Sequence, residues 1–138
     1  MKDISAFAAD LLMAVQLSLG QVPIDPPRAI AITPEKLHEM VCPNPLAKSC
    51  RVAAWYAPEG TVYIDETLDL EGDLFAKSIL VHELVHHVQR MTSGHNAKDC
   101  KDWRRREHEA YAVQIQWLQS VGANARSLRG QFPFVRCN

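Results

Sequence analysis

Hydrophobic and polar residues follow a helical pattern over most of the chain. Long helices are predicted over residues 2–19, 70–91 and 101–121. In the first of these, apolar residues recur every three to four positions, as one face of an amphipathic helix requires. Gly20 and Gly122 follow the first and the last, and glycine is typical of a helix end. Thr33 and Pro34 predict a further short helix, because together they supply an N-cap and a proline at the first helical position.

Two short stretches rich in Val, Trp, Tyr and Ile predict β-strands. They lie within residues 51–66 on either side of Pro58-Glu59-Gly60, so they form a hairpin or two neighbouring strands. Residues 21–32 are interrupted by prolines and are interpreted as a linker. The whole pattern predicts an α+β fold in a single domain, residues 1–138. This domain is mostly helical, with a small β-sheet immediately before the helix over 70–91.

That helix carries ionisable groups among apolar ones, in the segment "VHELVHHVQR" at residues 81–90. His82 and His86 are four positions apart, so on a helix they project from the same face and can meet a single cation. Glu83 follows the first histidine and can accept a proton from a metal-bound water without being a ligand. The pattern H-E-x-x-H on a helix is typical of zinc metallohydrolases.

A purely structural interpretation of these residues is weaker. A histidine in an apolar helix is often a core residue held by hydrogen bonds, but here two histidines and a glutamate on one turn all need partners. One zinc ion per chain supplies a partner for both histidines, and its water supplies one for Glu83. His87 lies on a different face from His86, so we expect it to support the site or to lie at the surface.

A catalytic zinc site usually has three protein ligands, so a third is expected after His86. The candidates are His95, Glu107, His108 and Glu109. The helical stripe of Glu107 is the more apolar one, because it also holds Ala110, Tyr111, Gln114, Trp117 and Leu118. An apolar stripe should face the metal-binding helix. Glu107 is therefore the predicted ligand, and Glu109 is the alternative.

Together, "HELVHHVQ" and "REHEAYAVQ" resemble the gluzincin branch of the zincin metallopeptidases, in which a glutamate on the helix after HExxH is the third zinc ligand. The resemblance covers about residues 51–121, and the small size is similar to that of the minigluzincins. Tyr111 stands where membrane-embedded gluzincins have an aspartate that contacts a histidine ligand, and its hydroxyl would replace that contact. The resemblance implies a peptide or protein substrate, bound in extended form along the edge strand of a sheet beside the active-site helix.

The expected activity is zinc-dependent hydrolysis of peptide bonds or related amides. Zinc at the three ligands would lower the pKa of its bound water toward neutrality. Glu83 would take the proton as general base and pass it to the leaving amine. Candidates for a donor to the oxyanion are Tyr63, His108 and Tyr111. The alternatives are a zinc-stabilised binding module without catalysis and a latent enzyme whose own terminal segment covers the cleft.

The composition argues against two classes of partner. The formal net charge is −1 and charged residues make up 22% of the chain, without the basic excess of a nucleic-acid binder. No stretch approaches the roughly 18 apolar residues that a membrane span needs.

The run Arg104-Arg105-Arg106 is the only dense basic patch in the sequence. It is interpreted as a solvated helix start, with a basic rim that attracts acidic substrate groups as the alternative.

Four cysteines, with no CxxC pair, argue against a zinc knuckle and for two disulfides. Cys42–Cys50 would close the short loop "CPNPLAKSC". Cys100–Cys137 would tie the C-terminal tail, predicted to be irregular, to a helix start. Disulfides imply an oxidising compartment, so we expect a secreted or periplasmic protein whose signal peptide is absent from this sequence. Free thiols in a cytoplasmic protein are the alternative.

Overall fold

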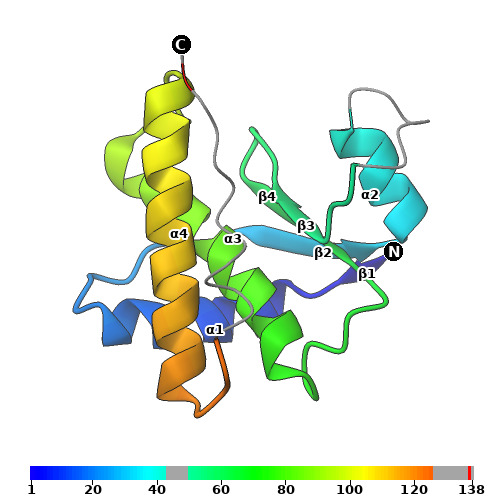
Figure 1. The fold of residues 1–138 in the computed structure, drawn as a ribbon, viewed down its shortest axis with the longest axis horizontal. Helices are drawn as coiled ribbons and strands as arrows, with labels where there is room; N and C mark the ends of the chain where they lie inside the picture. The colour runs from blue at the N-terminus through cyan, green and yellow to red at the C-terminus, as the bar shows by residue number, and fades with distance from the viewer. Residues whose placement is uncertain (43–49, 126–136, 138) are drawn as a thin grey trace.

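The computed structural model describes residues 1–42, 50–125 and 137. Its elements follow in the order β1 (Lys2–Asp3), α1 (Ser5–Ser18), β2 (Arg28–Ile32), α2 (Pro34–Val41), β3 (Ala54–Tyr56), β4 (Thr61–Asp65), α3 (Leu74–Ser93) and α4 (Cys100–Ser120). The predicted α+β class is confirmed: within the described residues, four helices accompany one four-stranded sheet (Figure 1). Apart from residue 137, the predicted irregular tail lies outside the described residues.

β2 lies inside the sheet, whose strand order is β1-β2-β4-β3. It pairs parallel to β4, with Ala29 opposite Val62 and Ala31 opposite Ile64, and antiparallel to β1. The interpretation of residues 21–32 as a linker is therefore wrong for its last five residues. Residues 29–32 are buried, so this strand lacks the alternation of apolar and polar residues that marks a half-exposed strand.

β3 and β4 form the predicted hairpin. The two strands pair antiparallel, with Ala54 opposite Ile64 and Tyr56 opposite Val62. Gly60, whose φ is 95°, provides the left-handed backbone of the turn between them. β3 is the last strand of the sheet order, and it lies against α3. The helix with the H-E-x-x-H segment therefore stands next to an edge strand.

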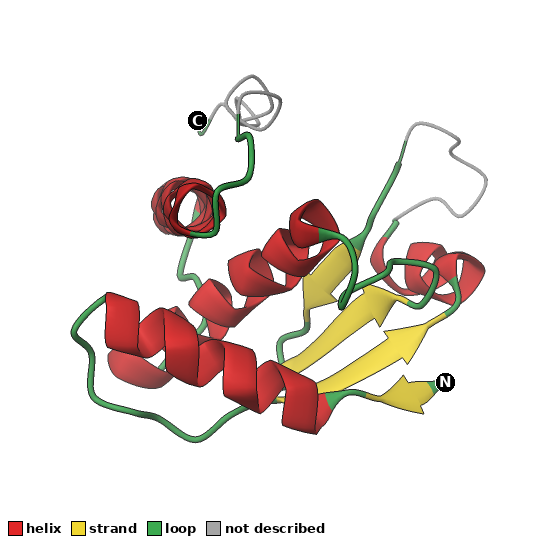
Figure 2. Cartoon of the chain, turned by 90° about the horizontal axis from the view of Figure 1, so that it is seen from below, coloured by secondary structure: helices red, strands yellow, loops and turns green. Residues whose placement is uncertain are grey.

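Different helices cover the two faces of the sheet (Figure 2). On one face, β2 and β4 pack against α1 and α3 in a core that includes Leu12, Val62, Ile64, Leu80 and Leu84. On the other face, residues of β2 and the hairpin pack against α2 in a second cluster that includes Ile30, Ile32, Leu37, Trp55 and Tyr63. α4 packs on α3, on the side away from the sheet. α3 is therefore enclosed between the sheet and α4.

Aspartate caps fix the starts of both long helices. The side chain of Asp73 accepts hydrogen bonds from two backbone N–H groups of the first turn, so α3 begins at Leu74 and not at Leu70. Asp99 caps α4 by accepting one hydrogen bond, from the backbone N–H of Asp102, and this helix begins at Cys100, one residue before the predicted start. The caps therefore define where the two helices that pack on each other begin.

Both predicted disulfides are confirmed, Cys42–Cys50 and Cys100–Cys137. The first joins the end of α2 to the segment before β3, and the second joins the start of α4 to residue 137. Two disulfides are consistent with an extracellular or periplasmic location. None of the described helices is both long enough and apolar enough to cross a membrane, as the sequence predicts.

Candidate metal centre

α3 and α4 bring the three predicted ligands together. Oε1 of Glu107 on α4 lies 2.5 Å from Nε2 of His86, and its Oε2 lies 3.4 Å from Nε2 of His82. One ligand atom from each residue lies within 4.8 Å of the others. Ala110, one turn beyond Glu107, is fully buried in the core that α3 lines. Its small side chain lets the two helices approach closely enough for the carboxylate to reach both histidines.

Gln114 of α4 fixes the ring of His82. The Ser78 hydroxyl donates to the carbonyl oxygen of Phe75 (2.6 Å), so Ser78 Oγ accepts from Nε2 of Gln114 (3.0 Å). The carbonyl oxygen of Gln114 is thereby turned to His82, whose Nδ1–H donates to it (3.0 Å). With a hydrogen on Nδ1 held by Gln114, the ring of His82 directs Nε2 toward Glu107.

Gln89 of α3 does the same for His86. Its Nε2 donates to the backbone carbonyl of Arg106 and to Oε1 of Glu109, both at 2.9 Å. Oε1 of Gln89 therefore accepts from Nδ1–H of His86 at 2.8 Å, which leaves Nε2 to face Glu107. Glu109, the alternative third ligand, thus belongs to the hydrogen-bond chain behind His86.

This donor set fits zinc. Two imidazole nitrogens and one carboxylate oxygen form a ligand set typical of catalytic zinc, with a further position for water. The three acceptors cannot bond to one another without a cation or a proton between them. The orientation of both histidines is fixed by amide oxygens, as is usual for metal-binding histidines.

The pKa values of these groups are shifted by their neighbours. Burial alone would lower the pKa of His86, but its hydrogen bond to Glu107 and the charges of Glu83 and Glu107 raise it to about 9. Burial alone would raise the pKa of Glu107, but hydrogen bonds to His82 and His86 lower it to about 2. Both shifts have one physical meaning: the residues surround a point that strongly favours positive charge.

Glu83 lies beside the ligands in a cleft of about 910 Å³ that α3, α4 and β3 line. Its side chain is buried in the cleft wall, with the residue 9% exposed. Tyr111 lines the same cleft, and its ring stands edge-on to that of His82 with 4.4 Å between centroids. The resemblance implied a contact between the Tyr111 hydroxyl and a histidine ligand; the Nδ1–H of His82 instead donates to Oε1 of Gln114.

The other candidates for a supporting role lie elsewhere. Tyr63 packs on the far face of the sheet, 6.1 Å from the ring of Trp55, and its hydroxyl donates to Glu59 at 3.2 Å. Tyr63 therefore cannot stabilise an oxyanion in the cleft. His108 is exposed and His95 follows the end of α3; neither belongs to the ligand group.

His87 is buried and faces β3. Its Nε2–H donates to the carbonyl oxygen of Asp25 at 2.7 Å, so its Nδ1 accepts from the hydroxyl of Tyr56 at 2.8 Å. Burial lowers the pKa of His87, which favours this neutral form. The expectation of a surface position is wrong, and the residue instead ties α3 to the edge strand.

Gln89 and Gln114 are the residues that the sequence prediction missed. Both are buried polar residues on helices, at 9% and 2% exposure. Gln89 follows His86 by three positions and Gln114 follows Glu107 by seven, so each shares a helical face with a ligand. A polar residue on the buried face next to a ligand is the signal that would have found them.

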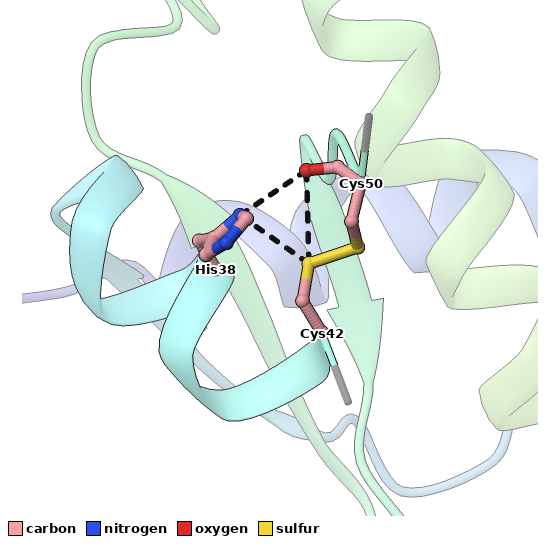
Figure 3. Close-up of a disulfide and its surroundings, with 3 residues drawn as sticks. All are labelled: His38, Cys42 and Cys50. Carbon is pink, nitrogen blue, oxygen red and sulfur yellow. Dashed lines mark hydrogen bonds between the residues drawn. A yellow bond between two sulfur atoms is a disulfide. The ribbon is translucent and has the colours of Figure 1, made fainter. Parts of the chain in front are cut away.

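A second group of metal-ligating side chains lies at the end of α2 and consists of His38, Cys42 and Cys50. Figure 3 shows the two sulfurs joined in a disulfide, with the imidazole of His38 turned toward it. Nδ1 of His38 donates to the carbonyl oxygen of Cys50 at 3.1 Å and lies 3.3 Å from Sγ of Cys42. In this state the group offers neither thiolate nor a free Nδ1 lone pair to a metal.

One family model matches residues 13–128, and its description is "Domain of unknown function (DUF6647)". The chain belongs to this family. The matched region contains Glu83 and all three candidate ligands. No curated protein and no solved structure matches the chain.

Proposed function

We propose that this DUF6647 protein is a zinc-dependent metallopeptidase. One observation carries the proposal: Nε2 of His82, Nε2 of His86 and the carboxylate of Glu107 converge, while an amide oxygen holds the Nδ1–H of each histidine. Hydrogen bonds that serve only to satisfy buried histidines would not need to turn three acceptors toward one point. Glu83, the residue that catalysis needs and metal binding does not, lies in the wall of the same cleft.

When bound, zinc supplies Lewis-acid chemistry, lowering the pKa of water and polarising a carbonyl group. Glu83 is placed next to the ligands on α3 and acts as general base, holding the proton on its carboxylate and returning it to the leaving amine. Tyr111, in the cleft wall beside His82, is the candidate donor to the developing oxyanion.

The edge strand β3 suits an extended peptide. Among the described residues it pairs with β4 on one side only, and residues 51–56 line the cleft that holds Glu83. A peptide can add to such an edge through main-chain hydrogen bonds, which leaves its scissile bond near the metal ligands. The hydrogen bond between Tyr56 and His87 holds this strand against α3. The resemblance to gluzincins implies the same mode of binding.

The test is Glu83→Gln in zinc-reconstituted protein, assayed against a broad peptide library with mass-spectrometric detection of cleavage. The amide keeps the size of the side chain but cannot accept the proton, so we expect about one zinc per chain and a loss of hydrolysis of at least about 100-fold. Glu71→Gln, at an exposed position before α3, is the matched control and should cleave like the wild type. Wild-type protein that binds zinc without cleaving any peptide would favour the silent binding module or the latent enzyme.

A further inference from the structure

We infer that Arg90 forms an anion-binding subsite at one end of the cleft and recognises a carboxylate of the substrate. The inference rests on the proposed function, since it concerns what the same cleft accepts. Arg90 follows His86 by one helical turn and lines the cleft together with Glu83. One turn of helix rises about 5.4 Å, so the guanidinium lies within one or two peptide residues of the metal ligands.

The side chain of Arg90 is held in place by the hairpin. Its Nη1 packs so closely on Gly60 that a Cβ at that position would lie 2.6 Å away. The Tyr56 hydroxyl lies beside the same glycine, 3.4 Å from that Cβ position, and donates to Nδ1 of His87. The charge of the Arg90 guanidinium opposes the rise in the pKa of Tyr56 that burial causes. These contacts position the guanidinium but use only part of its five N–H donors.

The positive charge of Arg90 has no carboxylate partner among the described residues. Each ion pair among the described residues involves a cation other than Arg90. Arg106, a buried arginine of the cleft wall, differs. Its Nε pairs with Asp102 at 3.3 Å, and its terminal nitrogens donate to His95 and Ser93. Arg104 and Arg105 do not line the cleft, and Arg51 lines it from an exposed position. Arg90 is therefore the half-buried cation of the cleft wall that has no carboxylate partner among the described residues.

The residues around Arg90 determine the extent and the polarity of the proposed subsite. Nδ2 of Asn96 donates to the carbonyl oxygen of Pro58 at 3.1 Å, which joins the loop after α3 to the hairpin turn. Both residues line the cleft, so its Arg90 end is bounded by this contact. Phe75 and Ile79, further toward the start of α3, line it with apolar groups. The cleft thus suits a substrate with an apolar side chain toward Phe75 and Ile79 and a carboxylate at Arg90.

That carboxylate has two chemical sources, an Asp or Glu side chain and the C-terminus of a peptide. Three sets of alanine-rich octapeptides with a central Phe separate them. One set is amidated and carries a single Glu at each other position in turn, one carries Gln at those positions with a free C-terminus, and one carries Gln and is amidated. Binding is measured by calorimetry on zinc-loaded Glu83→Gln protein, so the readout does not depend on hydrolysis.

We expect at least one carboxylate peptide to bind about tenfold more tightly than its neutral counterpart, as a charge-assisted pair in a half-buried site permits. Adding Arg90→Gln should abolish this preference, and Arg90→Glu should transfer it to peptides with Lys at the same position. Arg105→Gln removes the same charge from an exposed position outside the cleft and should keep the preference. Equal binding of all three sets, or a preference that survives Arg90→Gln, would overturn the inference. A preference that follows Arg90 in a protein without peptidase activity would uphold the subsite and refute the proposed function.

Discussion

Among the residues that the structure describes, two groups of three metal-ligating side chains differ in which atoms point inward. In each group the three ligand atoms lie within 4.8 Å of one another. At His82, His86 and Glu107, the Nδ1 hydrogens are held on the outside by Gln114 and Gln89, and the Nε2 atoms and the carboxylate face the centre. At His38, Cys42 and Cys50, a ring hydrogen points inward to a carbonyl oxygen, and the sulfurs are bonded to each other.

The comparison shows that proximity of ligand residues does not define a metal site. The orientation of lone pairs does, and in proteins it is set by the hydrogen bonds behind the ligands. We propose that the first group holds a cation, whereas the disulfide of the second cross-links α2 to the segment before β3. The following experiments separate these two roles.

The largest effect is expected from removal of the third ligand. Glu107→Ala should lower zinc affinity more than about 100-fold, because loss of a ligand should exceed the 10- to 100-fold loss that supporting residues give. His38→Ala should leave the affinity unchanged, and Glu109→Ala should have a small effect. Competition with a chromophoric chelator measures all three. A larger loss in Glu109→Ala than in Glu107→Ala would mean that α4 is rotated relative to α3.

The choice between these two glutamates shows what the sequence could predict. The apolar stripe of α4 pointed to Glu107, and the structure places that stripe, with Ala110, Gln114 and Leu118 buried, against α3. Helical periodicity is a local property, so residue spacing was enough to predict α3, α4 and the shared helical face of His82 and His86. The cysteine pairing followed from the short distance between Cys42 and Cys50 along the chain.

Other features depend on contacts that are distant in sequence. β2 was missed because a strand buried on both faces shows no alternation, and its partner β4 lies about thirty residues further along the chain. Tyr63 was only a candidate donor to the oxyanion, because hairpin residues point to alternate faces and the sequence does not say which face meets α3. The roles of Gln89 and Gln114 depend on how α3 and α4 pack against each other, which residue spacing within either helix does not give.

The second effect concerns the disulfide group. The double variant Cys42→Ser/Cys50→Ser should lose about 2.5 kcal/mol in the free energy of unfolding, because the unfolded chain regains the entropy of a short loop. Chemical denaturation of the zinc-loaded protein measures this. Zinc content should stay at that of the wild type, since neither cysteine belongs to the metal centre. A fall in zinc content would show that the two groups are not independent.

A smaller effect is expected from the hydrogen bond behind His82. Gln114→Leu removes the acceptor of the Nδ1–H and should lower zinc affinity about tenfold. Gln114→Glu keeps an acceptor at that position and should retain the affinity. The electronic spectrum of the cobalt-substituted protein reports the ligand geometry and should change in the Leu variant only. If both variants bind zinc like the wild type, Gln114 serves the core and does not orient His82.

The central claim is that zinc binds at His82, His86 and Glu107. X-ray absorption at the zinc edge tests it most directly, because it identifies the types of ligand atom around the metal in the intact protein with both disulfides formed. For wild-type protein reconstituted with one equivalent of zinc, we predict nitrogen and oxygen ligands only, with the scattering pattern of two imidazoles at about 2.0–2.1 Å. In Glu107→Ala, an oxygen of the protein should be replaced by solvent while the imidazole pattern remains. A sulfur ligand near about 2.3 Å, or zinc that is lost on desalting the wild type, would contradict the account.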